Sequence, residues 1–377
     1  VAGRSGDWEP VDSVAGIIAL VASLTNSTSD DIDRGIAASR MTPQEFFDLF
    51  GVMPASRAAT LDSVDTLRSQ VEANPALLEQ FRLLQGRLAL AENALLAAKA
   101  RVPARSAATG GDFGSNNWVV GPQLARDGRS AYLANDPHLG LTNPAIWYLV
   151  HLDARSAGRG GRIHVAGASF AGMPGIILGQ NEDIAWGATT TFFDQADVYI
   201  ETLARDGSGV VRNGQTVPFV RRAVEISRYT TTGEQEVVTR DAYYVPGHGP
   251  VLSLDLRAGT AVTSRWTGHT LGSDINFPWD IMVASTEAEA RQAFRDSTSI
   301  GQNFVTIDRQ GNFGWYPYNF VPSRPWTTVY PAYVPIPGDG RFEWQGGIPE
   351  GQLPQARNPG RGFIATANAD MTGQLYD

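Results

Sequence analysis

From residue 115 onward the chain is a succession of short apolar runs separated by turns, and this pattern limits the fold more than any other feature. Runs such as RIHVAG (162–167), ADVYIETL (196–203) and NFVTIDRQGNFGWYPY (303–318) are divided by Gly, Asn and Asp. Short strands joined by tight turns pair in antiparallel fashion, whereas parallel strands need a long crossover between them. Because helical periodicity is concentrated before residue 100, we predict an α+β fold with antiparallel sheets.

The part of the chain before residue 100 carries clear helix signals. SVAGIIALVASL (13–24) is an apolar run of the buried type. TPQEFFDLFG (42–51) offers Thr42 as N-cap, Pro43 at the first helical position and Glu45 as capping-box partner. A helix is also expected from Pro75, with an apolar stripe formed by Leu77, Phe81, Leu84, Leu88, Ala91 and Leu95.

The composition changes between these two parts. ARVPARSAATGGDFG (100–114) is small, polar and Gly-rich, which is typical of an exposed linker. We therefore divide the chain into a helical part (1–99), a linker (100–114) and a β-rich part (115–377). Within the last part, helical pattern returns mainly at STEAEARQAFRDS (285–297), for which Ser285 is the expected cap.

Composition and charge exclude several classes of partner and site. The net charge of -9 and the isoelectric point near 5.1 argue against nucleic acid or an anionic membrane surface, because no basic patch could neutralise phosphates. The chain has no cysteine, so it has no disulfide, thiolate nucleophile or zinc–thiolate site. We find no apolar run near the roughly 18 residues of a membrane span. The chain starts at Val1, and we expect a soluble segment of a longer protein.

One serine stands out in GGDFGSNNWVV (110–120), and two interpretations of it are open. Ser115 lacks the G-x-S-x-G setting of a nucleophile elbow, so it can be an ordinary turn residue before a strand. Alternatively, scission of the Gly114–Ser115 bond makes Ser115 the first residue of a chain. Its α-amine, with an unperturbed pKa of about 7.7 to 8.0, could then activate its own hydroxyl. From residue chemistry alone, the turn residue is favoured.

Motifs for other chemistries are absent. The sequence contains neither H-E-x-x-H nor a phosphate-binding G-x-x-x-x-G-K-[ST] loop. The histidines lack the spacing of metal ligands: they are His138, His151, His164, His248 and His269.

A resemblance to a known family favours the second interpretation of Ser115. Six stretches resemble, in order and spacing, the β-chain of the penicillin acylase family of N-terminal nucleophile hydrolases. They are GSNNWVV (114–120), NDPHLGL (135–141), GMPGIILGQNEDIAWGATTTFFDQADVYIET (172–202), DRQGNFGWYP (308–317), VPIPGDGRFEWQG (334–346) and NPGRGFIATAN (358–368). VDSVAGIIALVASLTNSTSDDID (11–33) is similar to the end of that family's α-chain, so the resemblance extends from about residue 9 to 370.

The resemblance implies a fold, a maturation step and catalytic roles. The fold is the four-layer αββα sandwich with two stacked antiparallel sheets. A precursor cuts itself at Gly114–Ser115 and yields an α-chain/β-chain heterodimer, in which Ser115 is nucleophile and, through its amine, general base. The backbone N–H of Thr190 and the side-chain amide of Asn368 would stabilise the oxyanion. His138 would orient the nucleophile or hydrogen-bond its amine.

The resemblance also implies ligand sites and a location. By motif position the apolar acyl pocket is formed by Leu20, Leu24, Leu139, Ala188 and Phe192. The preponderance of leucine slightly favours an aliphatic acyl chain over a phenylacetyl group. Asp194, Asp197 and the carbonyl of Ala196 match residues that hold structural calcium in several family members, completed here by Asp31 or its neighbour Asp30. Capping of turns by these aspartates is the alternative. No cofactor is expected for catalysis, and the location implied is periplasmic or secreted.

The implied activity is hydrolysis of an amide between an apolar acyl group and a polar amine, with β-lactams and N-acyl-homoserine lactones as the substrate classes to test first. Family members continue for several hundred residues past the matching asparagine, whereas this sequence ends at Asp377 and is unbroken at Ser115. We therefore expect this form to be an inactive precursor. Two alternatives stay open: an uncut homologue that binds acyl ligands without turnover, and a serine hydrolase with a His–Asp relay that is active uncut.

Overall fold

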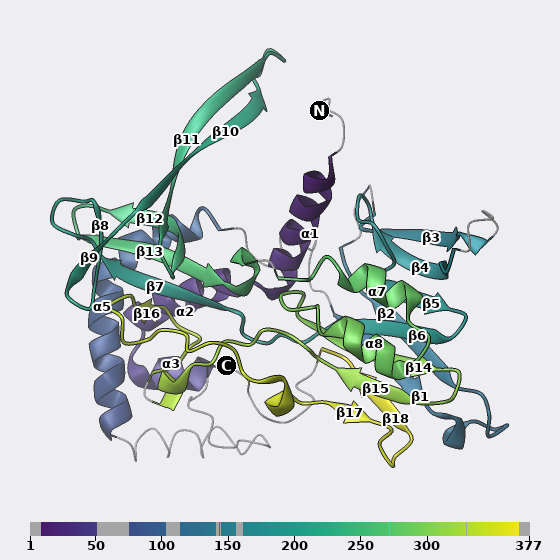
Figure 1. Ribbon diagram of the computed structural model, residues 1–377. Helices are drawn as coiled ribbons and strands as arrows, with labels where there is room; N and C mark the ends of the chain where they lie inside the picture. Colours follow the sequence, from purple (N-terminus) through teal and green to yellow (C-terminus); the bar gives the residue numbers. More distant parts are fainter. Residues whose placement is uncertain are drawn as a thin grey trace.

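Helices form the N-terminal part of the computed structural model, which describes residues 9–50, 75–102, 114–140, 143, 145–155, 161–270, 272–328 and 330–368 (Figure 1). They are α1 (Pro10–Thr25), α2 (Thr28–Arg40), α3 (Pro43–Phe50) and α5 (Pro75–Lys99). The predicted capping box of α3 is confirmed: the Thr42 N–H donates to Glu45 Oε2 at 2.8 Å, and the Glu45 N–H donates to Thr42 Oγ1 at 3.3 Å. The predicted stripe of α5 is buried from Phe81 to Leu95, whereas Leu77 lies outside the described side chains. Most of the predicted linker (103–113) also lies outside the described residues.

Two of the antiparallel sheets formed from residue 115 onward stack on each other, as the resemblance implies. The larger sheet has the order β17 (Ala356–Arg357), β15 (Phe313–Tyr316), β14 (Gln302–Asp308), β6 (Ile184–Thr190), β5 (Leu178–Asn181), β4 (His164–Phe170) and β3 (Trp147–Asp153). The smaller one has the order β18 (Phe363–Thr366), β1 (Ser115–Val120) and β2 (Tyr132–Pro137).

Side chains alternate along β14 between the two faces of the larger sheet, and each face packs against a different layer. Val305 and Ile307 face the smaller sheet, where they pack with Val119 of β1. Phe304 faces the opposite way and stacks on Phe294 of helix α8 (Glu287–Phe294), with ring centroids 4.6 Å apart. Helix α7 (Phe277–Val283) packs beside α8, so helices cover the outer face of the larger sheet. A helical layer beyond the smaller sheet is not among the residues that the structure describes.

The helices near residue 285 differ in detail from the prediction. The N-cap of α8 is Thr286, whose hydroxyl accepts from the Glu289 N–H at 3.2 Å, and not Ser285. Ser285 instead donates its backbone N–H to the Glu289 carboxylate. Helix α7 was not predicted, because its seven residues are too few to show a clear helical period, although Asn276 and Pro278 are possible start signals.

A third sheet carries the N-terminal helices. Its order is β10 (Val220–Tyr229), β11 (Gln235–Val245), β12 (Gly249–Asp255), β13 (Thr260–Trp266), β7 (Ala196–Thr202) and β16 (Ile336–Pro337), and only the β16–β7 pair is parallel among the described strands. Helices α2 and α5 pack on it through one apolar cluster that includes Ile36, Leu88, Tyr199 and Val262. Strands β10 and β11 extend away from the body as a long exposed ribbon (Figure 1). A short hairpin, β8 (Gly209–Arg212) and β9 (Gln215–Pro218), lies near the end of β7.

One expectation about membranes needs correction. Among the described residues, the helical segment Pro10–Arg40 is long and apolar enough to cross a membrane by length and composition alone. In the structure this segment is two helices, separated at Asn26 and Ser27. Helix α2 is largely buried, whereas α1 is buried only near its end, where Val21 packs against Ala196 and Trp266.

Candidate active site

Ser115 is the first residue of β1, the central strand of the smaller sheet. Side chains alternate along a strand, and Ser115, Asn117 and Val119 face the buried side. Ser115 lies opposite Pro137 of β2, and its backbone N–H donates to Asn368 Oδ1 just beyond β18. Ser115 is therefore held by both neighbouring strands and is only 9% exposed.

Asn368 connects Ser115 with the end of β6. Its side-chain Nδ2 donates to the carbonyl of Thr190 at 3.0 Å, while its Oδ1 accepts from Ser115. The backbone of Asn368 has a φ of +59°, a left-handed conformation that asparagine tolerates better than most residues. This turn directs the side-chain amide of Asn368 back between Ser115 of β1 and Thr190 of β6.

The backbone N–H of Thr190 points toward the same side. The Thr191 N–H donates to the Gly301 carbonyl at 3.0 Å, and Thr190 lies opposite Gln302 of β14. Hydrogen-bonded and non-hydrogen-bonded pairs alternate in an antiparallel ladder, so the N–H and C=O of Thr190 point away from β14. Acceptance of the Asn368 amide by the Thr190 carbonyl agrees with this direction. The structure thus brings together Ser115, Thr190 and Asn368.

His138 contacts the site through its backbone and not through its ring. Its N–H donates to the carbonyl of Gly114 at 2.9 Å, the carbonyl that precedes Ser115. Its imidazole lies 2.9 Å from Asp136 Oδ2, and half of the side chain is exposed. The ring contacts Asp136, and its predicted role beside the nucleophile stays a prediction.

Asn135 is a positioning residue that sequence reasoning missed. Its side chain donates to the carbonyls of Asn116 at 3.0 Å and Ala188 at 2.9 Å, and accepts from the Ala188 N–H at 3.1 Å. One amide thus fixes β1, β2 and β6 relative to each other. A Cβ on Gly187 would lie 2.9 Å from the Asn135 Cβ, which explains the glycine. The sole signal in the sequence was its place in NDPHLGL.

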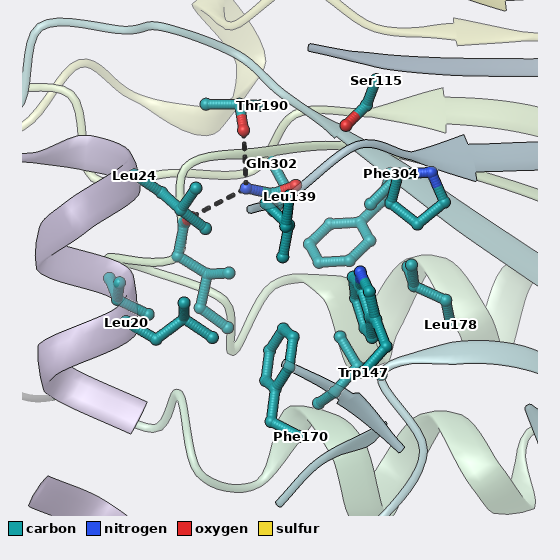
Figure 2. A pocket seen from close by; sticks show the side chains of 15 residues that line it. Leu20, Leu24, Ser115, Leu139, Trp147, Phe170, Leu178, Thr190, Gln302 and Phe304 are labelled. Atoms are coloured by element: carbon teal, nitrogen blue, oxygen red, sulfur yellow. Dashed lines mark hydrogen bonds between the residues drawn. The ribbon is translucent and has the colours of Figure 1, made fainter. Parts of the chain in front are cut away.

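Ser115 opens into an apolar cavity of about 50 Å³ (Figure 2). Four predicted pocket residues line it: Leu20, Leu24, Leu139 and Ala188. Phe192 does not line it; with φ at +56° its side chain is 43% exposed. Sequence reasoning missed several lining residues, because apolar residues of this kind resemble ordinary core in a sequence: Val21, Trp147, Phe170, Ile177, Leu178, Ile300 and Phe304.

A larger cavity of about 250 Å³ adjoins the first along helix α1. The two cavities share Leu20 and Phe170 in their walls. Gly16 and Ile17, one turn before Leu20, line the outer cavity, and Val21 and Leu24 line the inner one. Because the rise is 1.5 Å per residue, this face of α1 runs about 12 Å from Leu24 to Gly16.

The predicted calcium ligands surround an arginine. Arg324 Nε lies 2.9 Å from Asp197 Oδ2, and its Nη atoms lie 3.3 Å from Asp194 Oδ2 and 3.4 Å from the Ala196 carbonyl. All of these side chains are buried. Asp31 is buried near them, whereas its neighbour Asp30 is partly exposed, so Asp31 is the acid of the pair that joins the cluster.

The cluster holds more carboxyl groups than its arginine neutralises. Burial raises the pKa of Asp31 well above its ordinary value, and the negative charge of Asp194 adds to this effect. Burial also raises the pKa of Asp197 to about 6, although Arg324 acts in the opposite direction. No group of three acidic or histidine side chains among the described residues is placed to hold a metal ion. A guanidinium contacts three of the four predicted ligands, which favours Arg324 over calcium as their counter-charge, while one oxygen each of Asp31 and Asp197 is buried without a hydrogen-bond partner. Calcium binding by these residues stays a prediction.

Known proteins are similar to this chain in sequence. The sequence profile of penicillin amidase matches residues 2–377. Acyl-homoserine lactone acylase QuiP from Pseudomonas aeruginosa is 29% identical over 67% of this chain and 30% of its own length. Penicillin G acylase from Escherichia coli is 28% identical over 67% of this chain and 28% of its own length. Penicillin acylase 2 proenzyme from Pseudomonas sp. is 32% identical over 73% of this chain and 35% of its own length.

A solved structure shows the same fold. Thermostable penicillin G acylase from Alcaligenes faecalis is similar with a TM-score of 0.58 and 27% identity, over 67% of this chain and 43% of that one. The chain spans about a third of the length of the curated relatives it matches. The α+β fold with stacked antiparallel sheets is that of N-terminal nucleophile hydrolases, and the chain belongs to the penicillin amidase family.

Proposed function

We propose that the protein is an amide hydrolase that uses Ser115 as an N-terminal nucleophile, after self-cleavage at Gly114–Ser115. The observation that carries the proposal is the position of Ser115, between an apolar cavity and the amide of Asn368. The names of the relatives support acyl-amide chemistry. The α-chain/β-chain heterodimer and the periplasmic or secreted location belong to the same proposal.

Self-cleavage begins with the uncut peptide. The Ser115 hydroxyl attacks the Gly114 carbonyl carbon, the C–N bond breaks, and the nitrogen takes the hydroxyl proton, so that an ester replaces the amide. Water then hydrolyses the ester and releases the α-amine of Ser115. The His138 N–H, which donates to the Gly114 oxygen, would stabilise the negative charge that develops there.

Hydrolysis of the substrate then uses the new amine as a base. An amide nitrogen is not basic, whereas an α-amine is partly neutral near pH 7.7 to 8.0 and can accept the hydroxyl proton. Ser115 attacks the substrate carbonyl and forms an acyl-enzyme, the amine product leaves with the proton, and water releases the acid. The Thr190 N–H and the Asn368 amide are the proposed donors to the oxyanion.

The Asn368→Gly variant tests this donor. Glycine tolerates the left-handed backbone at this position, so the change removes the amide without backbone strain. We expect kcat to fall by about 100- to 1000-fold, as for loss of one oxyanion donor. Asn213→Gly is the matched control, since Asn213 has a φ of +50° in the β8–β9 turn. Equal kcat values for the two variants would exclude Asn368 as a donor.

The cavity favours an aliphatic acyl chain. Its walls near α1 are leucines, and the adjoining cavity continues along the same helix. We therefore propose that N-acyl-homoserine lactones with medium or long chains are better substrates than penicillin G. Release of homoserine lactone from its decanoyl amide, compared with release of phenylacetate from penicillin G, tests the choice. Faster cleavage of penicillin G would overturn it.

Gly16→Leu should shorten the accepted acyl chain. A Cβ on Gly16 meets nothing within 4 Å, so a leucine extends into the outer cavity without a clash at its first carbon. Each methylene kept out of the cavity costs about 0.8 kcal/mol, so exclusion of two lowers kcat/KM for a dodecanoyl amide about tenfold. Hexanoyl amides should be unaffected. Gly86→Leu on α5, which also has open space at Cβ, is the control.

The uncut, non-catalytic alternative makes a distinct prediction. An acyl-binding homologue would stay one chain after expression of its full-length gene and would bind acyl amides without releasing acid. Mass spectrometry of the purified protein, together with assay of acid release, separates the two functions. An intact chain without turnover would favour the alternative.

A further inference from the structure

The indole N–H of Trp147 is a polar group of the acyl cavity that lacks a hydrogen-bond partner. Trp147 is the first residue of β3 and lines the cavity, and its Nε1 is buried without a hydrogen-bond partner. Its ring packs against Phe170 with centroids 4.5 Å apart, and Figure 2 shows Leu178 and Phe304 on its other sides. The N–H therefore lies among apolar side chains.

Other buried tryptophans in the described part of the chain are satisfied. Trp186 donates to the Ile177 carbonyl at 2.9 Å and Trp315 to Asn303 Oδ1 at 2.9 Å. Trp266 and Trp326 also have partners. A buried donor without a partner costs about 1 to 3 kcal/mol, and the buried tryptophans just named avoid this cost. The exception at Trp147 coincides with the cavity that we assign to the acyl group.

Water is a poor partner for this N–H. A buried water needs two to four polar partners, and the cavity wall around Trp147 is apolar. Besides Trp147, the polar residues of the lining are Ser115, Thr190 and Gln302. Thr190 and Gln302 hydrogen-bond to each other at 3.5 Å on another side of the cavity (Figure 2). An acceptor that arrives on the ligand itself would satisfy the N–H without burying a second unpaired group.

We propose that Trp147 selects acyl groups that carry an oxygen acceptor, an oxo or hydroxyl group, close to the scissile carbonyl. This inference rests on the proposed function. The cavity that Trp147 shares with Ser115 is small, so the acceptor must lie within the first few atoms of the chain. Binding pockets of this type combine apolar walls with a few polar groups that determine specificity.

Hydrolysis by the protein from the full-length gene tests the inference with matched substrates. The probes are the decanoyl, β-oxodecanoyl and β-hydroxydecanoyl amides of homoserine lactone. We expect kcat/KM to be about tenfold higher for the β-oxo or β-hydroxy amide than for the unsubstituted one. In Trp147→Phe this ratio should fall to about one, and the melting temperature should not decrease, since the variant removes an unpaired donor.

Trp186→Phe is the matched control. It removes an indole that has a partner, so it should lower the melting temperature and keep the substrate ratio of the wild type. A wild-type ratio of one, or the same ratio in Trp147→Phe and wild type, would overturn the inference.

Binding measurements separate this inference from the proposed function. Calorimetry with uncut Ser115→Ala protein and the primary amides of decanoic and β-oxodecanoic acid needs no turnover. Tighter binding of the β-oxo amide, lost in the Trp147→Phe double variant, supports the role of Trp147 even if the wild type hydrolyses nothing. Equal affinities for the two amides would overturn it, whatever the activity.

Discussion

Ser115→Ala should leave the protein as one uncut chain and abolish hydrolysis of acyl amides. The variant keeps the backbone N–H that donates to Asn368, so the strand and the site stay in place. It lacks the hydroxyl that attacks both the Gly114 carbonyl and the substrate. Loss of a nucleophile typically lowers kcat by more than about a thousandfold. Intact mass and N-terminal sequencing of protein from the full-length gene measure the cut, and acid release measures the activity.

The control for this experiment is Ser130→Ala. Ser130 is partly exposed and pairs with Asp127 in the turn before β2, away from the cavity. It should be cut and active like the wild type, with a new chain that begins Ser-Asn-Asn-Trp. A cut Ser115→Ala protein, or an uncut wild type that is active, would contradict the N-terminal nucleophile. The second result would favour a serine hydrolase with a His–Asp relay.

Arg324→Met should cause the largest loss of stability. The substitution leaves Asp194 and Asp197 buried without their cation, and removal of one partner of a buried ion pair costs about 3 to 5 kcal/mol. Denaturant unfolding measures the change in the free energy of unfolding. Arg40→Met is the control, because Arg40 pairs with Glu92 at the surface, where the two side chains are 56% and 30% exposed. A pair of this kind contributes about 1 kcal/mol or less.

The same cluster predicts the effect of metal removal. Because the guanidinium contacts Asp194, the Ala196 carbonyl and Asp197, a chelator should leave the melting temperature of the wild type unchanged. Added calcium should not restore Arg324→Met. A melting temperature that falls with the chelator and recovers with calcium would show that a metal ion, and not Arg324, balances these carboxylates.

The elements with local signals could be predicted from the sequence. The capping box of α3 and the stripe of α5 depend on residues a few positions apart, and both are confirmed. The cap of α8 was predicted one residue early, because Ser285 and Thr286 are both good capping residues. Helix α7 was missed, since seven residues are too few to show a clear helical period.

Only those residues of the candidate site that lie in the motifs shared with the family could be predicted. Resemblance indicated Ser115, Thr190 and Asn368, which the structure brings together. It could not give the ring of His138, whose orientation depends on the nearby Asp136, nor Arg324, which lies more than a hundred residues from the aspartates it contacts. The outward turn of Phe192 depends on its positive φ, which nothing in the sequence TTTFFDQ (189–195) indicates.

The packing of α2 and α5 on the third sheet has a consequence for how the protein refolds after denaturation. These helices precede Ser115, and the strands beneath them follow it, yet they share one apolar cluster. While the chain is continuous, refolding after denaturation is unimolecular. Once the bond before Ser115 is cut, the same cluster becomes an interface between two polypeptides, and its recovery depends on their concentration. Maturation would therefore convert a reversible folding equilibrium into an association reaction that dilution opposes.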